Sequence, residues 1–257
     1  MANIAIEQRG VVTIVTIDRP ARRNAVDAAT AIDLRAAFEA FDADPVARIA
    51  ILTGAGGTFC AGYDLHSVSE SAPPYDAQGP GPMGPTRLLT GKPVIAAVEG
   101  HAVAGGLELA LWCDLRVAAE TATFGVFCRR WGVPLIDGGT VRLPRLIGQS
   151  RALDMILTGR AVDAAEALAI GLANRICPPG EALAHAIELA GTIAAFPQLC
   201  LRADRLSAYR QWDHDLPEAL THEGEGGEAP LNAEGLAGAG RFSRGAGRGG
   251  TVEDAKS

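Results

Sequence analysis

The sequence predicts an α/β fold, in which short buried strands alternate with helices. Three nearly continuous apolar runs, at 49–53, 93–98 and 115–118, have the length and composition of strands buried on both faces. Glycine turns follow the first two runs, at 54–57 and 105–106. The order strand, glycine turn, helix, strand is typical of an α/β domain.

The chain is expected to begin with a hairpin, because two strand-like segments at 4–9 and 11–18 flank Gly10. Asp27 or Thr30 is a suitable N-cap for the helix that follows. The apolar residues of that helix recur at helical spacing and predict its buried face: Ile32, Leu34, Ala37, Phe38 and Phe41.

Two later helices are predicted over 150–158 and 163–170, because Gly159 and Gly171 stand just past their ends. The segment 69–85 is rich in proline, glycine and serine and is interpreted as a mobile loop. Glycine-rich stretches at 223–228 and from Gly235 onward are expected to be mobile in part.

The character of the sequence changes after about residue 197, where an arginine-containing amphipathic helix is predicted over 198–212. We therefore expect a core domain over 1–196 and a helical region with a glycine-rich tail over 197–257.

Composition excludes several classes of protein. The formal net charge of −7 over 257 residues argues against a nucleic-acid binder. The five cysteines contain no C-x-x-C pair, which argues against a zinc site or a disulfide framework and favours reduced, buried thiols in a cytoplasmic protein. The N-terminus does not resemble a signal peptide, and no apolar run approaches the ~20 residues that span a bilayer.

The most informative motif is Val-Ala-Gly-Gly-Leu-Glu-Leu at 103–109, where two glycines open a predicted helix. Glycines let the backbone approach a ligand, and the first N–H groups of a helix have no internal partner. Such a turn is suited to binding an oxyanion, with Glu108 beside it to handle a proton. A glycine-mediated packing contact with a surface glutamate is the alternative, since isolated glycine motifs are weak signals.

Six more segments stand in a distinctive order around this turn. Phe-Cys-Ala-Gly-Tyr-Asp-Leu at 59–65 precedes it, and Phe124-Gly125, Gly-Val-Pro at 132–134 and Asp-Gly-Gly-Thr at 137–140 follow. Leu-Thr-Gly-Arg at 157–160 and Gly-Leu-Ala-Asn at 171–174 complete the set. Together, over roughly residues 4–200, these motifs resemble the enoyl-CoA hydratase/isomerase (crotonase) superfamily.

The resemblance implies a ClpP/crotonase-like spiral of ββα units with a helical C-terminal region, assembled as a homotrimer or as a hexamer of two trimers. It implies an acyl-CoA thioester as substrate, with CoA as part of the substrate and no separate cofactor. By motif position, the backbone N–H groups of Ala61 and Gly105 would hold the thioester oxygen. Residues 197–257 would then serve in oligomerisation.

Glu108 falls where hydratases of this family keep one of two catalytic glutamates, while the second position is Cys128 here. A thiol replaces a carboxylate as acid and base only if its pKa is lowered, for which Arg129 and Arg130 are candidates. A small buried packing cysteine is the other interpretation.

Asp137 is a second carboxylate candidate. Either it caps the next helix, or it flanks the acyl group with Glu108, in which case the two carboxylates share the proton and water handling. Arg22 and Arg23 lie on a turn that the resemblance places against CoA, although an exposed basic turn is the plain alternative. Ala61, Gly62 and Asp64 are the other residues expected at the CoA site, with Asp64 more suited to fixing its loop than to chemistry.

The histidines, at 66, 101, 185, 214 and 222, are not recognised as having metal-ligand spacing, so no metal site is predicted. The expected activity is a lyase: hydration of the 2,3 double bond of an enoyl-CoA in fatty acid metabolism. A Δ3,Δ2-enoyl-CoA isomerase, an acyl-CoA hydrolase or dehydratase using Asp137, and a non-catalytic acyl-CoA binder remain alternatives.

Overall fold

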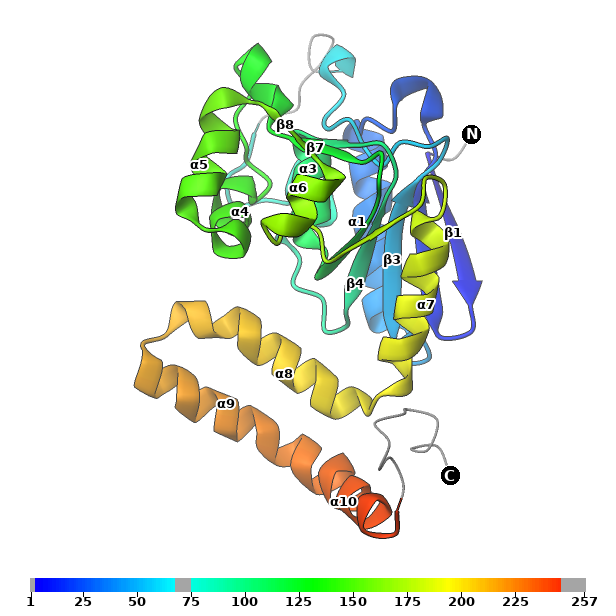
Figure 1. The fold of residues 1–257 in the computed structure, drawn as a ribbon, viewed down its shortest axis with the longest axis vertical. Helices are drawn as coiled ribbons and strands as arrows, with labels where there is room; N and C mark the ends of the chain where they lie inside the picture. Colours follow the sequence, from blue (N-terminus) through cyan, green and yellow to red (C-terminus); the bar gives the residue numbers. More distant parts are fainter. Residues whose placement is uncertain (1–2, 68–74, 246–257) are drawn as a thin grey trace. The chain divides into compact units, whose positions relative to one another are not determined.

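The computed structural model describes residues 3–67 and 75–245, and these residues form two compact units (Figure 1). The first unit comprises residues 1–90 and 94–190, and the second comprises 91–93 and 191–257. The division falls at Gly191, within α7 (Ala182–Ala195), whereas the sequence led us to expect a boundary after residue 196.

The first unit is built on a six-stranded sheet in the order β1-β2-β3-β4-β6-β9. Only β1 and β2 are antiparallel, and the remaining neighbours pair in parallel. The strands are β1 (Ile4–Arg9), β2 (Val12–Ile17), β3 (Ile49–Gly54), β4 (Val94–Val98), β6 (Leu115–Ala119) and β9 (Arg175–Cys177). The predicted hairpin and the three predicted buried strands are therefore confirmed.

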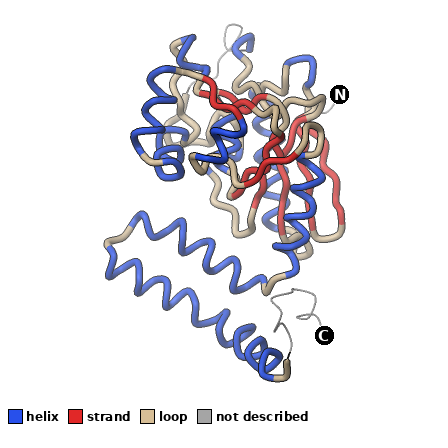
Figure 2. The backbone as a smooth tube through the Cα atoms, in the orientation of Figure 1, coloured by secondary structure: helices blue, strands red, loops and turns tan. Residues whose placement is uncertain are grey.

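A second, three-stranded sheet in the order β5-β7-β8 was not predicted. Its strands have only three residues each, too few for a periodic pattern to reveal: β5 (His101–Val103), β7 (Thr123–Gly125) and β8 (Ala161–Asp163). Figure 2 shows the strands of the first unit among its helices. The helices are α1 (Ala28–Ala43), α3 (Gly105–Trp112), α4 (Gly139–Ile147), α5 (Gln149–Thr158), α6 (Ala164–Ala169) and most of α7.

Helix α1 begins as predicted, because Asp27 accepts a hydrogen bond from the Thr30 backbone N–H at 2.8 Å. Leu34, Phe38 and Phe41 are buried in the core. Ile32 was wrongly assigned to that buried face. It is 69% exposed and lines the cavity described below.

The second unit is helical, with α8 (Gln198–Arg210), α9 (Leu216–Pro230) and α10 (Leu236–Ser243). A π-helical turn at Leu231–Gly235 joins α9 to α10, and its Glu234 carboxylate accepts hydrogen bonds from the first amides of α8, Leu199 and Cys200. Residues 223–228, expected to be mobile in part, lie within α9.

After Gly235, where partial mobility was expected, the chain forms α10. Residues 246–257, and 69–74 of the predicted loop, lie outside the described residues. Within the described ranges, no single helix is long and apolar enough to cross a membrane, although one bent pair of helices passes the same test jointly.

Candidate active site

The segment 59–65 lies directly against the strand that leads to the Gly-Gly turn. Cys60 donates its backbone N–H to the His101 carbonyl at 2.8 Å, and Val103 donates to the Cys60 carbonyl at 3.1 Å. These two bonds form a parallel β-bridge between Cys60 and Ala102. Two motifs some forty residues apart in the sequence therefore share one wall.

Ala104 sets the direction of the Gly-Gly turn. It adopts a left-handed φ of 54°, which is uncommon for a residue with a side chain, and its N–H donates to the Gly125 carbonyl at 2.9 Å. Helix α3 starts at the next residue, so the Gly105 N–H is one of the unpaired amides of a first helical turn. A Cβ on Gly106 would collide with the Cys60 carbonyl, which explains the second glycine.

Tyr63 contributes the second free amide, in place of the expected Ala61. The Ala61 N–H donates to the Arg23 carbonyl at 3.0 Å and is therefore already occupied. The amides of Tyr63 and Gly105 have no hydrogen-bond partner among the described residues, and both residues line the cavity. A Cβ added to Gly62 would lie 3.0 Å from the Gly105 nitrogen, which shows how closely the two segments approach.

Glu108 lies one helical turn beyond Gly105, and its carboxylate is nearly enclosed, at 3% exposure. Its Oε1 accepts hydrogen bonds from the backbone N–H groups of Asp137 and Gly139, both at 2.8 Å. Burial, reinforced by the Asp137 charge, raises the pKa of Glu108 to about 7 despite those two bonds. A carboxyl group poised near neutral pH is suited to both accepting and returning a proton.

Asp137 does not cap the helix that follows it. The N-cap of α4 is Gly138, which makes no side-chain cap bond. Instead Asp137 Oδ1 accepts from the Met83 backbone N–H at 3.0 Å and from the Thr86 hydroxyl. The capping interpretation is therefore wrong, and the Asp137 carboxylate fastens the segment before β4 to the wall of the cavity.

Cys128 also reaches the cavity but remains a thiol. Burial raises its pKa, and the charge of Glu108 raises it further, while Arg129 opposes the shift less strongly. The hypothesis that Arg129 and Arg130 activate a thiolate is therefore wrong, and packing is the role that the structure supports.

A cavity of about 730 Å³ joins these groups, which is within the usual range for small-molecule sites. Its polar wall carries Glu108 and Asp137, and its apolar wall includes Tyr63, Met83 and Trp131. Sequence reasoning missed Met83, which lies in the segment interpreted only as a loop.

Four residues expected near CoA do not line this cavity: Arg22, Arg23, Gly62 and Asp64. Arg22 and Arg23 are exposed on the turn after β2, and Asp64 is buried and paired with Arg19 at 3.2 Å. Arg19 also pairs with Asp27 at 2.7 Å, so one arginine ties the start of α1 to the segment 59–65. Asp64 thus fixes its own loop, where its carboxylate also accepts a hydrogen bond from the His66 backbone N–H. The Arg23 carbonyl binds the same segment by accepting a hydrogen bond from the Ala61 N–H.

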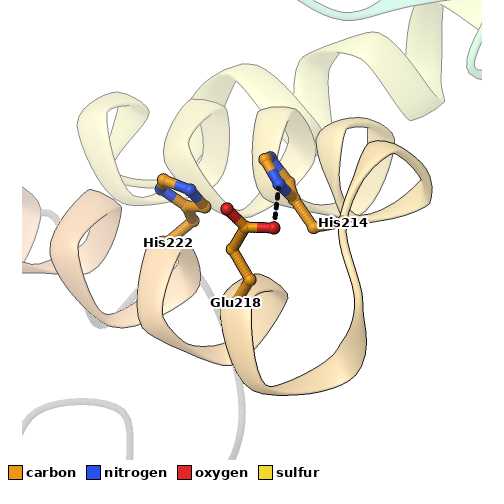
Figure 3. A group of neighbouring side chains, drawn as sticks. All are labelled: His214, Glu218 and His222. Atoms are coloured by element: carbon orange, nitrogen blue, oxygen red, sulfur yellow. Dashed lines mark ion pairs between the residues drawn. The ribbon is translucent and has the colours of Figure 1, made fainter.

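The second unit contains a separate cluster for which the sequence suggested no site. His214, Glu218 and His222 come together at the start of α9 (Figure 3), and their ligand atoms all lie within 4.8 Å of one another. The i, i+4, i+8 spacing was overlooked because the helix itself was not predicted across 216–230.

Comparison with known proteins agrees with the motifs. The profile of the enoyl-CoA hydratase/isomerase family matches residues 7–235. Enoyl-CoA hydratase EchA19 of Mycobacterium tuberculosis is 45% identical over 205 residues, covering 77% of each chain. A carnitinyl-CoA dehydratase of Salmonella arizonae is 40% identical over 204 residues, covering 78% of each.

The crystal structure of an enoyl-CoA hydratase from Mycobacterium tuberculosis superimposes with a TM-score of 0.89 at 35% identity. That match covers 94% of this chain and 96% of the other. The α/β fold, the helical C-terminal region, the predicted resemblance and the profile match agree, and the chain belongs to the enoyl-CoA hydratase/isomerase (crotonase) superfamily.

Proposed function

We propose that this protein is a hydro-lyase that adds water across the 2,3 double bond of an enoyl-CoA thioester. The observation that carries the proposal is the position of Glu108, a buried carboxyl group with a pKa near 7, in a cavity that also presents two free backbone amides. The similarity to enoyl-CoA hydratases supports the same assignment.

The thioester oxygen would accept hydrogen bonds from the N–H groups of Tyr63 and Gly105. Attack at Cβ pushes electrons onto that oxygen, and fixed donors stabilise the resulting enolate. Tyr63 replaces the expected Ala61 in this role, because the Ala61 amide is bonded to Arg23. Losing one donor in such a site typically costs roughly 3 to 4 kcal/mol.

Glu108 would begin the reaction ionised, with Oε1 held by two amides and Oε2 directed to the water. The water oxygen bonds to Cβ while Glu108 takes one of its protons, and the C2–C3 π electrons move onto the thioester as an enolate. Glu108 then returns the proton to Cα. Water is thereby added without net loss of a proton, so one carboxyl group is enough.

We assign Asp137 a positioning role in this scheme. Its amide holds Glu108, and its side chain holds Met83 and Thr86, so it joins the catalytic carboxylate to the segment before β4. Direct sharing of the proton transfer by Asp137, as the sequence first suggested, is the competing proposal, and Oδ2 of Asp137 is the atom it would use.

The CoA moiety would lie along the turn that carries Arg22 and Arg23, whose exposed guanidinium groups suit phosphates. Gly62 and Ala61 would form the backbone surface between this turn and the thioester. Asp64 would not contact CoA but would hold this segment in place through its ion pair with Arg19. The reaction is neither an oxidation nor a reduction, and the only activated group it requires is the thioester, so we propose no cofactor.

Dehydration is the second candidate activity, favoured by the 40% identity to a carnitinyl-CoA dehydratase. It uses the same groups in reverse on a 3-hydroxyacyl-CoA. A single proton-transfer carboxyl group also suits a Δ3,Δ2 isomerase, and hydrolysis or binding without turnover are the remaining possibilities.

A panel of acyl-CoA thioesters followed by mass spectrometry separates these activities. Hydration of a trans-2-enoyl-CoA adds the mass of water, dehydration removes it, isomerisation leaves the mass unchanged, and hydrolysis frees CoA. We expect water addition, abolished in Glu108→Gln with CoA binding retained. Binding without any mass change or isomer formation across the panel would contradict the assignment.

We also propose that the chain acts in fatty acid metabolism in the cytoplasm, as a homotrimer or a dimer of trimers, without nucleic acid or membrane. Large apolar side chains of the second unit are exposed and would be covered by assembly, among them Leu216, Leu231, Leu236 and Phe242. Light scattering coupled to gel filtration measures the state directly.

A further inference from the structure

The start of α9 gathers two histidines and a carboxylate outside the catalytic cavity. Glu218 and His222 lie one turn apart on α9, and His214, in the extended segment just before the helix, points toward them (Figure 3). The His214 Nδ1 lies 3.1 Å from Glu218 Oε2, and the two imidazole rings lie 4.4 Å apart between centroids.

These separations suit a small divalent ion. Ligand atoms bound to one zinc at 2.0–2.2 Å in tetrahedral geometry lie roughly 3.3 Å from each other. The His214–Glu218 pair already has that spacing, and the whole set lies within 4.8 Å, so small side-chain rotations complete the arrangement. Two imidazoles and a carboxylate select zinc-like transition metals over magnesium or calcium, which prefer oxygen ligands.

Two features around the cluster bear on metal binding. The His222 Nδ1 lies 3.5 Å from Glu225 Oε2, which leaves Nε2 for the metal. A carboxylate that accepts from the nitrogen not bound to the metal is the usual partner that orients a metal-binding imidazole. Residues 211–240 contain seven acidic residues and no lysine or arginine, although α8, which packs against α9, carries Arg202, Arg205 and Arg210.

The sequence of α9 gives such a site a physical task. Gly224, Gly226 and Gly227 lie inside the helix and weaken it, because glycine loses the most backbone freedom on folding. A metal that joins residues 214, 218 and 222 ties the segment before α9 to the first turns of the helix, just before this weak stretch.

We propose that His214, Glu218 and His222 bind one zinc-type divalent transition metal ion, which stabilises the N-terminal half of α9. The remaining coordination position is filled by water. The site is structural and does not depend on the hydratase assignment.

The test is a titration of the full chain, stripped with a chelator and desalted, with zinc chloride by calorimetry and far-ultraviolet circular dichroism. We expect one zinc per chain and a gain in helical signal. His214→Ala and His222→Ala each remove a ligand and should weaken zinc binding at least about a hundredfold. Glu225→Gln removes only a residue that orients a ligand and should weaken binding about tenfold.

His185→Ala is the matched control, because His185 lies on a helix between two carboxylates, Glu181 and Glu188, without a second histidine. It should leave zinc affinity unchanged. Absence of binding, equal binding by His222→Ala, equal loss in His185→Ala, or equal affinity for magnesium would overturn the proposal.

The cysteines are the competing ligands, and cobalt distinguishes them. A nitrogen and oxygen site gives no thiolate-to-cobalt charge-transfer band, and Cys200→Ser, which removes the exposed thiol, should bind zinc like the parent chain. A thiolate band, or loss of binding in Cys200→Ser, would assign the metal to cysteine and contradict this site. Circular dichroism without metal checks that each variant folds.

Discussion

Glu108 and Asp137 are joined through the backbone: the Asp137 N–H donates to Glu108 Oε1 at 2.8 Å. The Asp137 carboxylate meanwhile holds the Met83 amide and the Thr86 hydroxyl. One residue therefore holds the Glu108 carboxylate with its main chain and the segment at Met83 and Thr86 with its side chain.

The first prediction concerns the pH dependence of the reaction rate. Since the pKa of Glu108 is raised to about 7 and the scheme starts from its ionised form, kcat/KM should rise with pH through an acid limb near 7. Stopped-flow rates on an enoyl-CoA from pH 5 to 9 measure this limb, because the range extends well beyond about one pH unit on either side of its midpoint. A rate that is flat across this range would show that another group titrates.

The second prediction concerns stability. Both states protonate Glu108 below pH 4.5, but between about 4.5 and 7 the unfolded chain ionises it while the folded chain keeps it neutral. The contribution of Glu108 to the free energy of unfolding should therefore fall by about 3 kcal/mol across that window and change no further above it. Glu108→Gln keeps an acceptor oxygen for the two amides but cannot ionise. Urea unfolding at acidic and basic pH should show a smaller loss in this variant, and an identical loss in both proteins would contradict the prediction.

The third prediction concerns the two-amide site. Gly62→Ala forces a side chain onto a residue with φ +102° and places its Cβ 3.0 Å from the Gly105 nitrogen. We expect kcat to fall about a hundredfold, as when one oxyanion donor is displaced.

Gly57→Ala is the control for backbone strain alone, because its φ is +76° and its Cβ would meet nothing within 4 Å. It should lower stability with little effect on kcat. Equal losses of kcat in the two variants would locate the effect in strain rather than in the amides.

The fourth prediction separates positioning from proton transfer at Asp137. Asp137→Asn keeps an oxygen for Met83 and Thr86 but removes the charge, which raises the pKa of Glu108 in the parent chain. We expect the acid limb to move to lower pH with kcat reduced less than about tenfold. A loss of a hundredfold or more, the usual range for a lost general acid or base, would instead assign Asp137 to proton transfer.

The fifth prediction concerns CoA. Arg22→Ala with Arg23→Ala removes two exposed charges outside the cavity, so KM should rise and become less sensitive to salt while kcat stays unchanged. Steady-state kinetics at low and high ionic strength check this. A change in kcat with KM unaltered would exclude a role confined to substrate binding.

Local sequence patterns sufficed for much of the framework. The β1–β2 hairpin, the buried β3, β4 and β6, the Asp27 cap and the glycines that end α5 and α6 all depend on contacts between near neighbours or on burial of a whole apolar run. The family motifs likewise identified the superfamily before any geometry was known, because several short segments in a fixed order are specific together.

What sequence alone determined, then, was the fold class, the superfamily and the importance of the Gly-Gly turn with Glu108. Tertiary structure alone decided which amides are free, since only the contact with the Arg23 carbonyl removes Ala61 and leaves Tyr63. It also decided that Asp137 holds Met83 and Thr86 instead of capping α4, and that burial keeps Cys128 protonated. The physical reason is common to all three: hydrogen-bond occupancy and desolvation depend on partners that only the folded chain brings together, as Asp137 is bonded to residues 54 and 51 positions away.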